Sequence, residues 1–132
     1  MSSASQPEFF LDRSLGKETA RRLRQASWTI HLVADVYADD AQSIADEDWI
    51  AEGARRGWIL LTKDKRIRYR GTELAAVHQA RLFCLANGNL SIDEMVRWLS
   101  DAQHRILRAS AAHSRGFWKV YSDGRVERTW PR

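Results

Sequence analysis

The sequence predicts an α/β domain in which a short parallel sheet lies between two layers of helices, with a β-hairpin near the C-terminal end. Short apolar runs alternate with stretches of helical period, which is typical of parallel sheets covered on both faces. The run at 58–61 stops abruptly at polar residues, as strands buried on both faces do. Further on, Asp123 and Gly124 stand between two alternating segments, and this pair predicts a hairpin.

The boundaries of the predicted elements have local causes. Acids at 46–48 favour a helix start, because negative charge stabilises the N-terminal end of a helix, and Asp46 is the expected N-cap. Gly57 is expected just past the end of that helix, where a left-handed residue is common. Ser91 and Glu94 form a capping box that begins the longest helix. The expected elements are a tail at 1–7, strands at 9–11, 28–33, 58–62 and 81–85, helices at 17–25, 46–56, 72–78 and 92–110, a turn at 14–16, a loop at 37–43, and a hairpin at 117–130.

Length and composition are those of one soluble domain spanning residues 1–132. Hydrophobic residues make up 44% and charged residues 29% of the chain, which is enough apolar material for a core. The net charge of +4 favours an acidic partner such as nucleic acid. No stretch reaches membrane-spanning length, and the first seven residues carry no apolar targeting segment, so we expect a cytoplasmic protein with no membrane partner.

Three acidic residues are expected to meet at the carboxyl edge of the sheet, where open α/β sheets bind ligands. Asp12 ends the first strand, Asp64 ends the third, and Asp46 opens the helix before that third strand. Gathered carboxylates repel one another, and Mg²⁺ or Mn²⁺, which prefer carboxylate oxygens, remove that conflict. Each acid also fits a plainer role as a cap or turn residue, and Glu47 and Asp48 are alternatives to Asp46.

A run of cations follows the third predicted strand and favours phosphate binding, because it can release counterions from a nucleic-acid backbone. Ser14 can contact a metal-bound water or a phosphate, or it can cap a helix. Tyr69 can stack on a base, although ordinary packing is its expected role. The expected phosphate contacts are Arg13, Lys63, Lys65, Arg66 and Arg68.

The ordered segments Phe-Phe-Leu-Asp-Arg-Ser-Leu-Gly (9–16), Asp-Glu-Asp-Trp-Ile (46–50) and Gly-Trp-Ile-Leu-Leu-Thr-Lys-Asp-Lys (57–65) resemble the PIN-domain nucleases. The resemblance is greatest to the PIN-like branch that includes the VapC-type toxins of bacterial toxin–antitoxin pairs. It implies a PIN-like α/β/α fold, cleavage of RNA, and a metal site for Mg²⁺ or Mn²⁺. It also implies an antitoxin partner and a homodimer. Carried across by position, the metal-binding and catalytic acids are Asp12, Asp46 and Asp64.

The chain departs from the family pattern after the third aspartate. Many PIN domains carry a further acidic or polar residue soon after that position, whereas here no acid follows Asp64 until Glu73. Two other functions therefore stay open. One is a non-catalytic protein of the same fold that binds RNA or a partner through its basic face. The other is a receiver-like signalling domain, which fits less well because the first strand supplies Asp12 rather than an acidic pair.

Overall fold

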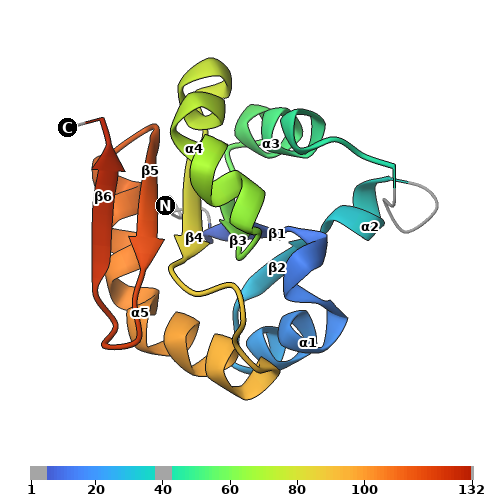
Figure 1. Ribbon diagram of the computed structural model, residues 1–132. Helices are drawn as coiled ribbons and strands as arrows, with labels where there is room; N and C mark the ends of the chain where they lie inside the picture. The colour runs from blue at the N-terminus through green and yellow to red at the C-terminus, as the bar shows by residue number, and fades with distance from the viewer. Residues whose placement is uncertain (1–5, 38–42, 132) are drawn as a thin grey trace, which may run out of the picture.

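The computed structural model describes residues 6–37 and 43–131, which form a sheet with helices on both faces (Figure 1). The predicted three-layer architecture is therefore confirmed. Most of the predicted tail at 1–7 and of the loop at 37–43 lies outside the described residues. The strands are β1 (Glu8–Leu11), β2 (Thr29–Leu32), β3 (Ile59–Thr62), β4 (Arg81–Leu85), β5 (Gly116–Val120) and β6 (Val126–Trp130). The helices are the 3-10 turn η1 (Arg13–Leu15), α1 (Lys17–Gln25), α2 (Val33–Val36), α3 (Asp46–Arg55), α4 (Lys65–His78) and α5 (Ile92–Ala112).

The order of strands in the sheet is β2-β1-β3-β4-β5-β6, and all neighbours are parallel except β5 and β6. The last two strands form the predicted antiparallel hairpin. β1 lies directly beside β3, with Phe9 opposite Ile59 and Leu11 opposite Leu61. Because β1 and β3 are parallel neighbours, the residues that follow them meet at one edge of the sheet.

Two separate cores lie on the two faces of the sheet, since successive side chains of a strand point to opposite faces. Phe9 and Leu11 pack with α1 and α5 on one face, and Phe10 and Leu60 pack with α3 and α4 on the other. In Figure 1, α3 and α4 lie above the sheet and α1 lies below it. A Cβ added at Gly53 of α3 would lie 2.2 Å from the Leu60 side chain, so a glycine lets this helix approach the sheet closely.

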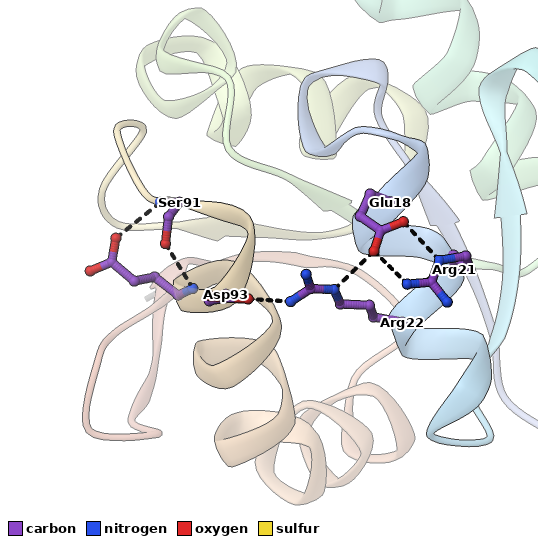
Figure 2. A network of polar contacts seen from close by, with 6 residues as sticks. Glu18, Arg21, Arg22, Ser91 and Asp93 are labelled. Atoms are coloured by element: carbon purple, nitrogen blue, oxygen red, sulfur yellow. Dashed lines mark hydrogen bonds and ion pairs between the residues drawn. The ribbon is translucent and has the colours of Figure 1, made fainter.

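On the other face, α1 and α5 are joined by charged side chains at their exposed rims (Figure 2). Arg22 of α1 donates to Glu18 at 3.0 Å and forms an ion pair with Asp93 in the first turn of α5. These side chains are all more than a third exposed, so the pairs add little free energy. They connect the last turn of α1 to the first turn of α5.

The predicted start of the helix after β3 is wrong. Helix α4 begins at Lys65 rather than Thr72, so the cations at 65–70 lie in its first turns. Ile67 is fully buried and holds those turns on the sheet, although cations surround it in the sequence. The glycine at position 71 is buried in the helix, where a Cβ would lie 2.2 Å from the Phe117 ring. That glycine permits close packing against β5 and does not end the helix.

Two further boundaries differ from the prediction. Ala45, rather than Asp46, is the N-cap of α3, and Asp46 is the first helical residue. The Asp46 carboxylate accepts a hydrogen bond from the Trp49 indole at 3.2 Å, which turns it along the helix and away from capping. Val33 begins the short helix α2 instead of ending β2.

The remaining boundary signals are confirmed. Gly57 follows α3 with a φ of 74°, the left-handed conformation that favours glycine there. Ser91 and Glu94 form the capping box, with hydrogen bonds of 3.1 Å and 2.9 Å. Within the described ranges, no helix combines the length and hydropathy needed to cross a bilayer.

Candidate functional site

The three predicted aspartates line one cavity of about 310 Å³ at the carboxyl edge of the sheet. Asp12 follows β1, Asp46 lies in the first turn of α3, and Asp64 is the N-cap of α4. Glu47 and Asp48, the alternatives to Asp46, are both exposed and do not line this cavity. The geometry therefore brings Asp46, and not its two neighbours, to the other aspartates.

Asp12 is the buried member of the group, with 8% of its surface exposed. Its Oδ2 accepts hydrogen bonds from the Ser14 hydroxyl at 2.7 Å and the Thr62 hydroxyl at 2.8 Å. Burial raises the pKa of Asp12, the two hydroxyl bonds lower it, and the charges of Asp46 and Asp64 raise it further. The site thus holds one carboxylate in a fixed orientation and at an electrostatic cost that a cation in the cavity would relieve.

Thr62 links two of the aspartates and was not among the site residues predicted from the sequence. Its hydroxyl donates to Asp12 and accepts a hydrogen bond from the backbone N–H of Asp64 at 3.0 Å. It is buried at the end of β3, where it is a polar residue closing an apolar strand. A polar residue at the end of an apolar strand is the one sequence signal that could have indicated Thr62 as a site residue. Its contact with Asp12 depends on the pairing of β1 with β3.

Asp64 is bonded through both of its carboxylate oxygens. Oδ1 accepts a hydrogen bond from the backbone N–H of Arg66 at 2.8 Å, which makes Asp64 a true helix cap. Oδ2 lies 3.2 Å from the Arg66 guanidinium, whose side chain is 80% exposed. Because that side chain is so exposed, its ion pair is weak and exchanges readily with water or a ligand.

The donor set suits a hard divalent cation, although it does not form a closed cage. Among the described residues, no three His, Cys, Asp or Glu side chains lie close enough together to surround one ion. Magnesium is commonly held by one or two carboxylates and keeps several waters. Both hydroxyls bond to Oδ2 of Asp12, and Oδ1 accepts no hydrogen bond from the described residues. Metal binding by Asp12, Asp46 and Asp64 stays a prediction.

The predicted phosphate-binding cations divide between two adjoining cavities. Arg13 and Arg66 line the aspartate cavity. Lys63, Lys65 and Arg68 line a second cavity of about 670 Å³, which shares Ser14 and Asp64 with the first. The basic run is therefore spread around the aspartates, as expected of a surface that binds a phosphate backbone.

The packing role expected for Tyr69 is wrong. The side chain is 76% exposed and lines the second cavity. The Arg68 guanidinium lies 5.6 Å from the ring centroid. Ile67 takes the buried position on this turn of α4, so Tyr69, two residues later, faces away from the core.

Comparison with known proteins identifies the fold family. Residues 7–87 match a family model described as "PIN like domain". The chain belongs to this PIN-like family. A relative from Mycobacterium tuberculosis, named "Putative ribonuclease VapC45", is 36% identical over 90 residues, which cover 65% of this chain and 65% of the relative. The match thus spans about two thirds of that relative's length. No solved structure matches the present chain.

The PIN-like match covers the part of the molecule that builds the site. It runs from the start of β1 to the residues after β4, and so contains the three aspartates, Thr62 and the basic turns of α4. Helix α5 and the C-terminal hairpin lie outside the matched residues. The resemblance seen in the sequence is therefore confirmed at the level of the family.

Proposed function

We propose that this PIN-like protein is a metal-dependent endoribonuclease that hydrolyses RNA phosphodiester bonds. The observation that carries the proposal is the convergence of Asp12, Asp46 and Asp64 on one cavity, where burial and the two other charges raise the pKa of Asp12. Such perturbed carboxylates in a cleft are typical of catalytic sites. The name of the mycobacterial relative supports RNA as the substrate.

In this proposal, Asp12, Asp46 and Asp64 would hold Mg²⁺ or Mn²⁺. A bound ion of this kind lowers the pKa of a coordinated water and neutralises charge on a phosphate. Thr62 and Ser14 orient Asp12 through their hydroxyl hydrogen bonds. The protein's own side chains thus hold the carboxylates in position. In the net reaction, water adds across a phosphorus–oxygen bond of the RNA and breaks it.

The cations beside the carboxylates bind the substrate. Arg66 and Arg13 line the same cavity, and guanidinium groups bind phosphate oxygens through charged hydrogen bonds. Arg66 holds Asp64 at 3.2 Å, so an incoming phosphate competes with that carboxylate for the guanidinium. Substrate binding and the release of Asp64 from its ion pair are coupled in this way.

We further propose that the protein acts as the toxin of a type II toxin–antitoxin pair, with an antitoxin protein as its partner. The support is the VapC name of the relative and membership of the PIN-like family. A homodimer is a prediction from the same resemblance.

The test is incubation of the purified protein with single-stranded RNA in the presence of Mn²⁺, Mg²⁺ or excess chelator. We expect fragments with either metal and none with chelator. Asp12→Asn should lower the rate about 10²-fold or more, because losing a metal ligand removes several kcal/mol of transition-state stabilisation. Circular dichroism should show that the variant stays folded.

Matched variants of Asp46 and Glu47 test whether Asp46, which lines the cavity, is the catalytic acid at the start of α3. We expect Asp46→Asn to lose cleavage and Glu47→Gln to keep it, since Glu47 does not line the aspartate cavity. The reverse result would show that the wrong acid has been assigned.

The second candidate is a non-catalytic RNA-binding protein. It is favoured by the lack, among the described residues, of three carboxylates close enough to share one ion. In that case RNA binds, with equal affinity with and without metal, and no fragments form.

A further inference from the structure

The cavity next to the aspartates has a lining that suits one nucleotide. It measures about 670 Å³ and shares Ser14 and Asp64 with the aspartate cavity. We infer that it binds a single unpaired nucleotide of the RNA, adjacent to the cleaved phosphate, with its base stacked on Tyr69. This inference rests on the proposed function, because it assigns a subsite to the same centre. The rest of the lining is Lys63, Lys65, Arg68, Tyr69 and residues 86–89.

Tyr69 is the first support. It is one of three large hydrophobic side chains exposed in the described ranges, with Val77 and Ile92, and of these it alone lines this cavity. An aromatic ring that is 76% exposed on a regular helix contributes little to the core. Its free face can take a base, since aromatic rings stack with any base. A base in a duplex is already covered on both faces, so the occupant is unpaired.

Two unneutralised charges are the second support. Within residues 6–37 and 43–131, neither Lys63 nor Lys65 forms an ion pair, whereas Arg66 lies 3.2 Å from Asp64 and Arg70 lies 2.7 Å from Glu47. The two lysine ammonium groups therefore remain available for the phosphates on either side of the bound nucleotide.

The loop after β4 supplies a fixed wall with amide groups. Arg68 donates to the Ala86 carbonyl at 2.8 Å, and the Asn87 side chain accepts from the backbone N–H of Asn89 at 2.8 Å. A Cβ added at Gly88 would lie 3.2 Å from the Lys63 carbonyl, so the loop packs tightly on the segment that joins β3 to α4. Asparagine amides both donate and accept hydrogen bonds, which is what the edge of an unpaired base requires.

The experiment uses the full chain carrying Asp12→Asn, which we expect to bind RNA without cutting it. The probe is a single-stranded RNA oligonucleotide with 2-aminopurine, whose fluorescence falls on stacking, placed at each position in turn. We expect quenching at one position next to the cleavage site. Adding Tyr69→Ala should remove this quenching and weaken affinity at least about fivefold, whereas Tyr69→Phe should keep both.

The control is Val77→Ala, which removes another exposed hydrophobic side chain from the same helix but does not line the cavity. It should leave quenching and affinity unchanged. An RNA that lacks the base at the quenched position should bind with equal affinity to the protein with Tyr69 and to the Tyr69→Ala variant. A difference between these two affinities would overturn the inference.

The outcomes separate this inference from the nuclease proposal. If the protein never cleaves RNA but the Tyr69-dependent quenching appears, the nuclease proposal fails and the nucleotide site stands. If the protein cleaves RNA and Tyr69→Ala binds and cuts as well as the parent, the nucleotide site is wrong. If Tyr69→Ala keeps RNA affinity but loses binding to a protein partner, the surface is a protein interface and the inference is overturned.

Discussion

The helices that follow β3 and β4 begin in opposite ways. The start of helix α5 follows the local rules for a helix N-terminus. Ser91 caps it, Glu94 bonds back to Ser91, and Asp93 adds a second acid to its first turn. Helix α4 is also capped, by Asp64, but its first turn has no acid. Its first turns instead carry Lys65, Arg66, Arg68 and Arg70.

One helix start thus follows the local rules for stability, and the other lines the candidate site. Cations near a helix N-terminus oppose the helix dipole by some tenths of a kcal/mol each. Helix α4 forms all the same, because Ile67 is buried and the glycine at 71 packs on Phe117. Local rules are commonly broken where a site needs particular side chains, and here the exception lies at the aspartate cavity. The start of α5 instead holds α1 through Asp93 and Arg22 (Figure 2).

Exchanging the two caps should have the largest effect. Serine and aspartate are both good N-caps, so Asp64→Ser and Ser91→Asp should each change the free energy of unfolding by less than about 0.5 kcal/mol. Cleavage of RNA with Mn²⁺ should fall about 10²-fold or more in Asp64→Ser, because the proposed metal ligand is lost. It should be unchanged in Ser91→Asp. An Asp64→Ser protein that cuts at the parental rate would mean that Asp64 is a cap and nothing more.

Removing a cation from the start of α4 should have an intermediate effect on RNA binding, and removing one from α5 should have none. We expect Lys65→Gln to weaken binding of single-stranded RNA several-fold and to reduce the slope of log affinity against log salt by about 0.7, the loss of one phosphate contact. It should also raise stability by a few tenths of a kcal/mol, because a cation leaves the helix N-terminus. Arg97→Gln, on the exposed side of α5, is the control and should change neither the slope nor the affinity. Equal slopes for both variants would show that the start of α4 does not contact the backbone.

The pH dependence of stability should show the smallest effect, because the Ser14 and Thr62 hydroxyls partly offset the burial of Asp12. The pKa of Asp12 is raised above its ordinary value of 3.8, so the folded state binds more protons than the unfolded chain just above that pH. The contribution of Asp12 to stability therefore falls as pH rises through that window. Asp12→Asn should accordingly be more stable than the parent at pH 7, with an advantage that shrinks as pH falls toward 3.8.

Denaturant unfolding at several pH values measures this advantage. Asp101→Asn, which replaces an exposed acid of α5, is the control and should show no comparable gain at pH 7. An advantage of Asp12→Asn that grows toward acid pH would contradict the sign of the pKa shift.

The sequence alone determined the elements whose causes lie within a few residues. Gly57 marked the end of α3, Ser91 with Glu94 marked the start of α5, and the pair Asp123–Gly124 marked the hairpin. It also placed acids at the ends of two strands, since the end of an apolar run is a local feature. These signals were enough for the α/β/α fold, and the ordered segments 9–16, 46–50 and 57–65 carried the PIN-like resemblance.

Only the tertiary structure decided which side chains meet. The pairing of β1 with β3 brought Thr62 to Asp12, and the packing of Ile67 on the sheet extended α4 and left Tyr69 exposed. The orientation of α3 put Asp46, rather than its acidic neighbours, into the cavity. These outcomes depend on contacts between residues far apart in the chain, and no pattern within a short window contains them.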